Sequence, residues 1–227
     1  MRAAPLTVAL VLVGCSSDDT RGEVLASIQT HVVKVESQDL VDRSLVLKDA
    51  AAAYCAAPTA DGLIATRDAW WAARQPLKRM QIIQFGPITE EPWRYGPDLD
   101  FWPARTGVID DLLAGDAGLT AQDFAAMGAS TRGFPAVEYV LYGIDDIDTR
   151  RCDFLVGGTA DIHTTATALH ETWTSEWSQR LADPSSHDDD AYGTPQDVID
   201  EWVNRMAFTV ENIRVTKLGK PAGDSSG

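Results

Sequence analysis

Apolar residues recur at helical spacing along most of the chain. Between Thr20 and about Ala56, charged residues separate a recurring apolar set, which comprises Val24, Leu25, Ile28, Val32, Val35, Leu40 and Leu47. Because side chains three or four positions apart share one face of a helix, this pattern predicts a long amphipathic helix. Pro58 ends it, and Thr59 is suited to cap a second helix that reaches about Met80.

The segment from about residue 84 to 105 breaks this pattern. It contains four prolines and two glycines among several aromatic residues. Proline removes a backbone donor and glycine loosens the chain, so this composition predicts a long loop with aromatic packing of its own. Loops of this length inside a compact domain tend to carry function. Beyond it, the pattern predicts short helices over 106–114 and 120–128, and a turn followed by a short helix over 132–143.

Two more long helices are predicted in the remainder of the chain. One runs from about Thr149 to Leu181, and the other opens at Thr194 and Pro195 and reaches about Leu218. Threonine followed by proline suits the cap and the first position of a helix. Few segments alternate with period two over the length of a strand. The sequence therefore predicts an all-α fold, an antiparallel bundle of long helices.

The N-terminus has the features of an export signal. Arg2 precedes an apolar run from Leu6 to Val13, which is shorter than the roughly 20 residues that span a bilayer. Leu12-Val13-Gly14-Cys15 resembles a bacterial lipobox, in which small residues precede a cysteine that becomes lipidated. We expect a signal peptide over 1–14, cleavage before Cys15 and lipid on that cysteine. An ordinary secretory signal is the alternative.

The same motif predicts where the mature protein is located. Residues 15–22 would form a polar tether, 23–222 a helical domain and 223–227 a tail. Ser16, rather than aspartate, follows the cysteine, and in lipoproteins of this kind that residue favours the outer membrane. The expected location is therefore the periplasm, with the protein anchored by lipid on Cys15, preferentially to the outer membrane.

The net charge of the chain limits which binding partners are expected. The chain carries a net charge of −15, and losing residues 1–14 removes one positive charge, Arg2, which makes the mature value −16. Such a protein repels nucleic acid and anionic headgroups, so neither is expected as a partner. Acidity is compatible with cation binding, but more often it only keeps a protein soluble.

Two cysteines remain once Cys15 is assigned to the lipid. Cys55 and Cys152 form an even pair in an oxidising compartment, which predicts a disulfide. Two buried free thiols are the alternative. Neither cysteine lies in a Cys-x-x-Cys motif or beside a histidine, so neither indicates zinc or redox chemistry.

Several segments, in order, resemble the imelysin family. They are Trp70-Trp71-Ala-Ala-Arg74, Phe85-Gly-Pro87, Asp98-Leu-Asp-Phe-Trp-Pro103 followed by Ile109-Asp110, Gly133-Phe-Pro-Ala-Val-Glu138, Arg151-Cys152 and Lys217-Leu-Gly-Lys-Pro-Ala-Gly223. The resemblance covers most of residues 23–223 and implies an all-helical protein outside the cytoplasm, built from two related bundle halves. Some members are linked to iron uptake or its regulation. The founding members are classed as metallopeptidases, with a Gly-x-His-x-x-Glu motif at a cleft between the halves.

This chain departs from that motif at one decisive position. Its segment runs from Gly133 to Glu138 with Pro135 where the family has histidine. Proline offers no side-chain ligand or base, whereas a zinc hydrolase normally uses three protein ligands and an open water position. Pro135 is instead suited to the first turn of the helix that carries Glu138. The chain also ends soon after Gly223, where family members commonly continue, so we expect a second half that is abbreviated or truncated.

The candidate binding residues come from the matched segments. They are Arg74, Asp98, Asp100, Trp102, Gly133, Pro135 and Glu138. Glu138 is expected either to bind a cation or a polar ligand, as the one candidate metal ligand, or to pair with an arginine such as Arg74 or Arg132. Asp98 and Asp100 could reach one hard cation, although such aspartates more often cap turns. Trp102 is expected to pack under the loop.

Three functions remain open at this point. The first is a non-enzymatic, lipid-anchored protein that binds a ligand or a metal, with a divalent metal or iron as the candidate cofactor, and that works with a protein partner in iron acquisition. The second is a divergent metal-dependent peptidase that recruits His163 or His170, which are seven residues apart and can share a helix face. The third is an adaptor or structural bundle with no small-molecule site.

Overall fold

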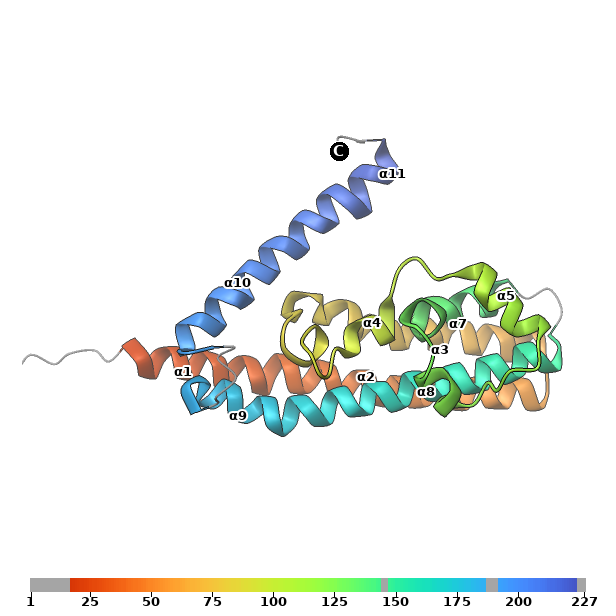
Figure 1. The fold of residues 1–227 in the computed structure, drawn as a ribbon, viewed down its shortest axis with the longest axis horizontal. Helices are drawn as coiled ribbons and strands as arrows, with labels where there is room; N and C mark the ends of the chain where they lie inside the picture. The colour runs from red at the N-terminus through yellow and green to blue at the C-terminus, as the bar shows by residue number, and fades with distance from the viewer. Residues whose placement is uncertain (1–16, 144–146, 187–191, 224–227) are drawn as a thin grey trace, which may run out of the picture.

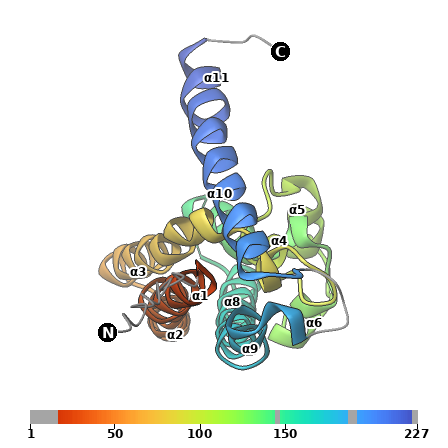
Figure 2. The same ribbon diagram turned by 90° about the vertical axis from the view of Figure 1, so that its left-hand side faces the viewer.

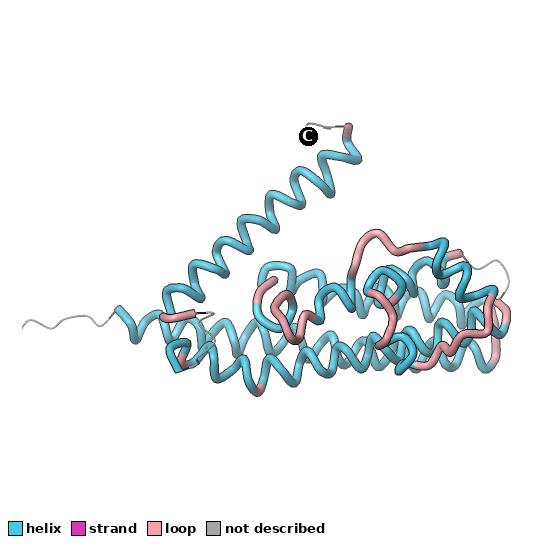
Figure 3. The backbone as a smooth tube through the Cα atoms, viewed as in Figure 1, coloured by secondary structure: helices cyan, strands magenta, loops and turns pink. Residues whose placement is uncertain are grey.

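The computed structural model describes residues 17–143, 147–186 and 192–223. Helix runs through most of these residues, and none of them lies in a β-strand (Figure 3). The prediction of an all-α helical bundle is therefore confirmed. Cys15, the signal segment and residues 224–227 lie outside the described residues.

Four helices form the centre of the bundle. They are α2 (Lys34–Ala56), α3 (Ala60–Arg79), α7 (Gly133–Tyr142) and α8 (Thr149–Thr174). Helix α2 packs against both α3 and α8, and α7 closes the ring by packing against the same two helices. Figures 1 and 2 show α3 and α8 both running antiparallel to α2. The Thr59 side chain caps α3 by accepting from the Gly62 N–H at 3.0 Å, as expected after Pro58.

The first long helix has a register change that its apolar pattern did not reveal. α1 (Ser17–Ile28) continues through a π-helical turn, η1 (Gln29–Val33), into α2. A π-turn holds more residues than an α-turn, so the buried face jumps five residues from Ile28 to Val33. Val35, expected on the buried face, is consequently 54% exposed. The helix also begins three residues before Thr20, the expected cap, so the expected tether is helical from Ser17 onward.

The region expected to be one long loop contains helical turns. Within 84–105 the chain forms η3 (Gly86–Ile88) and α4 (Tyr95–Asp100). The loop prediction was wrong for these segments because proline is tolerated in a first helical turn, where its missing N–H would have no partner. The expected aromatic packing is confirmed. Phe85 meets Trp173 edge to face at a centroid distance of 5.6 Å, and Trp93 meets Trp177 at 5.8 Å.

Further short elements lie between the longer helices. They are η2 (Met80–Ile83), α5 (Thr106–Ala114), α6 (Ala121–Ala125), η4 (Ala129–Thr131) and η5 (Pro184–Ser186). Helix α6 lies close against α8 at Gly157, where any Cβ would collide with the Leu119 carbonyl oxygen. The glycine thus sets how near the connecting segment can approach the bundle.

The helix expected from Thr149 to Leu181 is interrupted. Helix α8 ends at Thr174, and α9 (Glu176–Ala182) starts after Ser175, whose backbone leaves the helical region. Thr174 and Ser175 donate side-chain hydrogen bonds back to the carbonyls of His170 and Glu171, at 2.8 and 2.6 Å. Such back-bonding competes with the helical ladder and bends helices, which periodicity alone does not show.

The last helix leaves the body of the bundle. α10 (Pro195–Asn212) continues through the π-helical turn η6 (Ile213–Gly219) into α11 (Lys220–Ala222). Figures 1 and 2 show this continuous helix rising at an angle from α1 and α9, above α3 and α4. Thr209 fastens it by donating a 2.8 Å hydrogen bond to the Gln81 carbonyl of η2. Few of its side chains are buried, so a cleft remains between it and α3.

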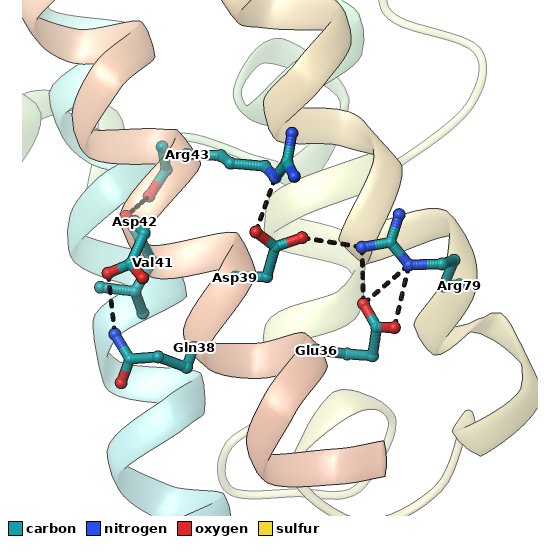
Figure 4. Close-up of polar contacts among 8 residues, drawn as sticks. Glu36, Gln38, Asp39, Val41, Asp42, Arg43 and Arg79 are labelled. Carbon is teal, nitrogen blue, oxygen red and sulfur yellow. Dashed lines mark hydrogen bonds and ion pairs between the residues drawn. The ribbon is translucent and has the colours of Figure 1, made fainter. Parts of the chain in front are cut away.

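A polar network joins the last turn of α3 to α2 (Figure 4). Arg79 Nε donates to both carboxylate oxygens of Glu36 at 2.9 and 2.8 Å, and Arg79 Nη2 donates to Asp39 at 2.7 Å. Asp39 also accepts from Arg43 Nε at 2.6 Å. Exposed pairs of this kind contribute roughly 1 kcal/mol or less each. Their main effect is to align the two helices of the hairpin.

The predicted disulfide is present. Cys55, near the end of α2, is bonded to Cys152, near the start of α8, with a Cα–Cα distance of 5.4 Å. The bond therefore fastens the two antiparallel helices at one end of the bundle. None of the helices in the described part of the chain is both long and apolar enough to cross a membrane.

Candidate functional site

The first turn of α7 carries the motif segment and lies tightly against α4. Gly133 has a φ of +75°, in the left-handed region, and a Cβ there would come within 2.5 Å of the carbonyl oxygens of Asp98 and Leu99. Only glycine avoids both penalties. Gly133 therefore has a structural role, since it lets α7 start where α4 ends.

Pro135 and Glu138 line the same cavity. Proline suits the first turn of α7, as expected, because the first N–H groups of a helix have no intrahelical partner. Three residues apart on one helix, the two side chains face the same side. The cavity has a volume of about 390 Å³. We call it the motif pocket, and it is lined by Trp102, Pro103, Ala104, Thr106, Pro135, Glu138, Tyr139, Tyr142 and Gly143.

Arg74 of α3 joins two carboxylates from different elements. Its Nη2 donates to Asp100 Oδ1 at 3.0 Å, and its Nη1 lies 3.8 Å from Glu138 Oε2. Lys78, one turn further along α3, also bonds Asp100. The guanidinium lies over the Trp70 ring, 5.2 Å from its centroid. The expected pairing of Glu138 with Arg74 is therefore present, and it extends into a four-residue cluster.

Burial decides the electrostatics of this cluster. It raises the pKa of the Glu138 carboxyl above its ordinary value, and the nearby Arg74 offsets this only in part. Burial likewise lowers the pKa of the Lys78 ammonium, against the opposing attraction of Asp100. Glu138 Oε2 and Arg74 Nε are both buried without a hydrogen-bond partner among the described residues. The cluster thus contains polar atoms that could still accept or donate.

Asp98 and Asp100 do not share a site. They lie in α4 rather than on a loop, and residues two apart on a helix point in different directions. Asp98 is 3.2 Å from Arg132 Nη1, whereas Asp100 turns toward α3. Arg132 is buried and also donates to Asp161 of α8 at 2.6 and 3.0 Å. This second cluster joins α4, α7 and α8 and serves the packing of the motif segment.

The two α8 histidines face α2. His170 Nδ1 is 2.8 Å from Ser37 Oγ, and His163 Nδ1 is 3.0 Å from Ser44 Oγ. Both histidines thus contact serines of α2, whereas Glu138 pairs with Arg74 of α3. A divergent peptidase that recruits these histidines to Glu138 gains no support from this arrangement. Burial lowers the pKa of both rings, which suits neutral imidazoles between helices.

Trp102 lies at the surface rather than under the loop. Its side chain is 59% exposed, contrary to the expected packing. It follows α4 closely and lines both the motif pocket and a second cavity beyond Asp100. The buried aromatic packing of this region is instead made by Phe85 and Trp93, which contact Trp173 and Trp177.

Two residues near the site were missed by the sequence patterns. Lys78 and Lys217 come from distant segments, and both line the second cavity. Lys78 follows Arg74 at the i+4 position, so it could have been placed on the same face of α3. Nothing local to Lys217 indicates that the last helix returns over α3.

The geometry defines a class of protein: an all-helical bundle in which α3, α4 and the motif helix α7 together hold a cluster of charged side chains. Comparison with known proteins supports a specific membership. The family model described as Imelysin, peptidase M75, matches residues 33–226. This chain belongs to the imelysin family.

Individual relatives are similar over nearly all of the chain. The iron-regulated protein A of Synechococcus elongatus is 25% identical over 238 residues, covering 96% of this chain and 63% of that protein. A crystal structure of an imelysin-like protein from Psychrobacter arcticum superposes with a TM-score of 0.80 at 24% identity, covering 97% of this chain and 67% of that one. A Parabacteroides distasonis structure, a candidate iron-regulated protein A precursor, gives 0.73 at 20% identity, with 92% and 63% covered. The chain thus spans about two thirds of the length of these relatives.

The donor set does not fit a bare metal ion. Pro135 has no ligating atom where the motif has histidine, and Glu138 faces the positive charge of Arg74. No group of three or more histidine, cysteine, aspartate or glutamate side chains in the described ranges could hold a metal. Glu138 is therefore better suited to a cationic partner group than to a metal.

Proposed function

We propose that this chain is an exported, lipid-anchored member of the imelysin family that binds a ligand without cleaving it and acts in iron acquisition. The observation that carries the proposal is Pro135 beside Glu138 in the motif pocket. A proline at this position removes the imidazole that a metallopeptidase motif would use. The carboxylate that remains forms part of a cluster with Arg74, Lys78 and Asp100.

The iron connection rests on relatives. Two similar proteins are described as iron-regulated protein A or its candidate precursor. The anchor rests on the lipobox ending at Cys15, and the location in the periplasm, preferentially at the outer membrane, rests on the same motif and on Ser16. A partner protein of an iron-uptake system would then meet the bundle at the membrane surface.

Proteolysis tests the non-enzymatic part of this proposal. The purified full chain and its Glu138→Gln variant are incubated with casein and with a mixture of short peptides, with and without added zinc or iron. We expect no cleavage above the level of the variant, because the motif pocket lacks a set of metal ligands. Metal-dependent cleavage that Glu138→Gln abolishes would contradict the proposal.

The abundance of the protein at different iron levels tests the iron connection. The abundance of the protein is compared in iron-replete and iron-depleted cells, and a protein used in iron acquisition should become more abundant on depletion. Equal abundance under both conditions would contradict the iron-related role while leaving ligand binding to be judged separately.

A further inference from the structure

We propose that the cleft between α3, α4 and the α10–η6 helix binds a small anion that carries two or more carboxylates. This inference rests on the proposed binding function and names its ligand class. We call this second cavity the cationic cleft. It has a volume of about 500 Å³ and is lined by Arg74, Lys78, Gln81, Gln84, Asp100, Trp102, Phe208, Thr209, Asn212, Thr216 and Lys217.

The charge of the cleft is opposite to that of the protein. Over the whole chain 34 acidic residues stand against 19 lysines and arginines. Among the described lining residues, three are cationic, namely Arg74, Lys78 and Lys217, and one, Asp100, is acidic. A concave site in which one sign of charge predominates concentrates ions of the opposite sign. In a protein this acidic, the cleft is therefore a local positive region that attracts anions.

The three cations come together only in the folded chain. Arg74 and Lys78 lie one turn apart on α3, and both bond Asp100. Lys217 reaches in from η6, and its ammonium is 2.8 Å from the neutral amide oxygen of Gln81. Among the described residues, no carboxylate lies within ion-pair distance of Lys217. Asp100 and Glu138 thus lie near the two α3 cations, whereas Lys217 has only a neutral partner.

These cations have donors to spare for a ligand. An ammonium has three N–H donors and a guanidinium has five, and carboxylates accept them in charge-assisted hydrogen bonds. The Arg74 side chain is only 12% exposed and Lys78 is 30% exposed, so bonds formed there would be sheltered from water. Two carboxylates of one small molecule could each meet a different cation, which favours a polycarboxylate over a single-charged acid.

The remaining lining suits a compact polar molecule between two aromatic walls. Gln84, Asn212 and Thr216 add neutral donors. Trp102, after α4, is 59% exposed and Phe208, on α10, is 61% exposed. An exposed aromatic ring on a cleft wall presents apolar area against which a ligand can pack. They would cover the carbon skeleton of a ligand whose carboxylates meet the cations.

The same chemistry explains how iron could be recognised without metal ligands. A bare cation would be repelled by the three positive side chains, whereas a ferric ion already bound by a polycarboxylate presents an anionic surface to them. The free polycarboxylate and its ferric complex share this surface. The experiment must therefore separate the two.

Calorimetric titration with citrate tests the inference. The purified full chain is titrated with citrate alone and with ferric citrate. Lys217→Glu replaces an exposed lysine of the cleft, so it should fold normally while reversing one charge. Lys220→Glu is the matched control, because it makes the same charge change on α11 outside the cleft. We expect binding to the parent chain at or below about 1 mM, weakened about tenfold or more by Lys217→Glu and less than about twofold by Lys220→Glu.

Each outcome has a defined meaning. Tighter binding of ferric citrate would identify the complex as the ligand, and equal or tighter binding of citrate would identify the free acid. No heat of binding from either form at about 5 mM would overturn the inference, as would equal losses from the two variants. These results do not depend on whether the chain is lipidated, iron-regulated or free of peptidase activity, so a failure of the proposed function would be recognised separately.

Discussion

Glu138 pairs with an arginine in a motif segment that lacks the histidine of the family pattern. In the family motif a histidine would lie three residues before it on the same helix face, but in this chain that place is held by Pro135. The carboxylate is left 3.8 Å from Arg74, and one of its oxygens is buried without a hydrogen bond among the described residues. In this chain the motif glutamate is therefore part of an ion-pair cluster with Arg74, Lys78 and Asp100.

The raised pKa of Glu138 predicts a pH effect with a defined sign. Burial raises this pKa above the ordinary value of 4.5. Between the two values the unfolded chain has lost the proton and the folded chain still holds it, so the free energy of unfolding falls as the pH rises. Glu138→Gln removes this contribution. Its stability relative to the parent chain should therefore increase from about pH 4.5 to pH 7.

Chemical unfolding across that pH range measures the effect. Glu211→Gln on α10 serves as the matched control, since that side chain is 70% exposed. If Glu138→Gln is instead less stable than the parent at pH 7 and the difference shrinks toward pH 4.5, the attraction of Arg74 outweighs burial and the predicted sign is wrong.

At the scale of elements, two features of helix α2 organise the bundle. Its buried face places Ser37 and Ser44 opposite His170 and His163 of α8, so polar pairs alternate with leucines along the contact. The π-turn η1 sets the phase of this face. Both features act at the contact between helices, because together they decide which residues of α2 lie opposite which residues of α8.

The disulfide between α2 and α8 predicts a loss of stability on its removal. Replacing Cys55 and Cys152 with serine frees a loop of 97 residues in the unfolded chain. The chain-entropy estimate for a loop of this length is about 4–5 kcal/mol. Urea unfolding of the double variant should show a correspondingly lower midpoint. The parent chain under reducing conditions is the control and should match the variant, and an unchanged midpoint in both would contradict the estimate.

At the scale of the whole molecule, the net charge of the chain does not favour attachment to a membrane. If residues 1–14 are removed as proposed, the chain carries a net charge of −16, so headgroups of anionic lipids repel it. Attachment to a membrane then depends on the lipid proposed for Cys15. The cationic cleft, a region of reversed charge, lies between helices, where a small molecule rather than a bilayer can enter.

Metabolic labelling tests this attachment. Cells that express the parent chain are grown with labelled palmitate, and the purified protein should carry the label. Cys15→Ser should remove it, because no other residue would accept the acyl chains. Cys55→Ser is the matched cysteine control and should keep the label. Label retained by Cys15→Ser, or absent from the parent chain, would rule out the anchor.

Helix periodicity and capping residues were sufficient to predict the all-α bundle, the α2–α3 hairpin and the start of α10. The pairing of Cys55 with Cys152 was predicted by counting cysteines. The ordered segments around Trp70 and Gly133 indicated the imelysin family, which the family model then confirmed. All of these depend on local spacing or on order along the chain, which a sequence displays directly.

Only the tertiary structure decided which side chains act together. Asp98 and Asp100 are two residues apart in the sequence, but α4 directs Asp98 toward Arg132 and Asp100 toward Arg74. Lys78 and Lys217 are far apart in the sequence, but the fold brings both into the lining of one cleft. Interactions between distant segments depend on helix phase and crossing, and small changes such as the π-turn η1 or the break at Ser175 alter both. These changes arise from competing hydrogen bonds and packing, which periodicity does not record.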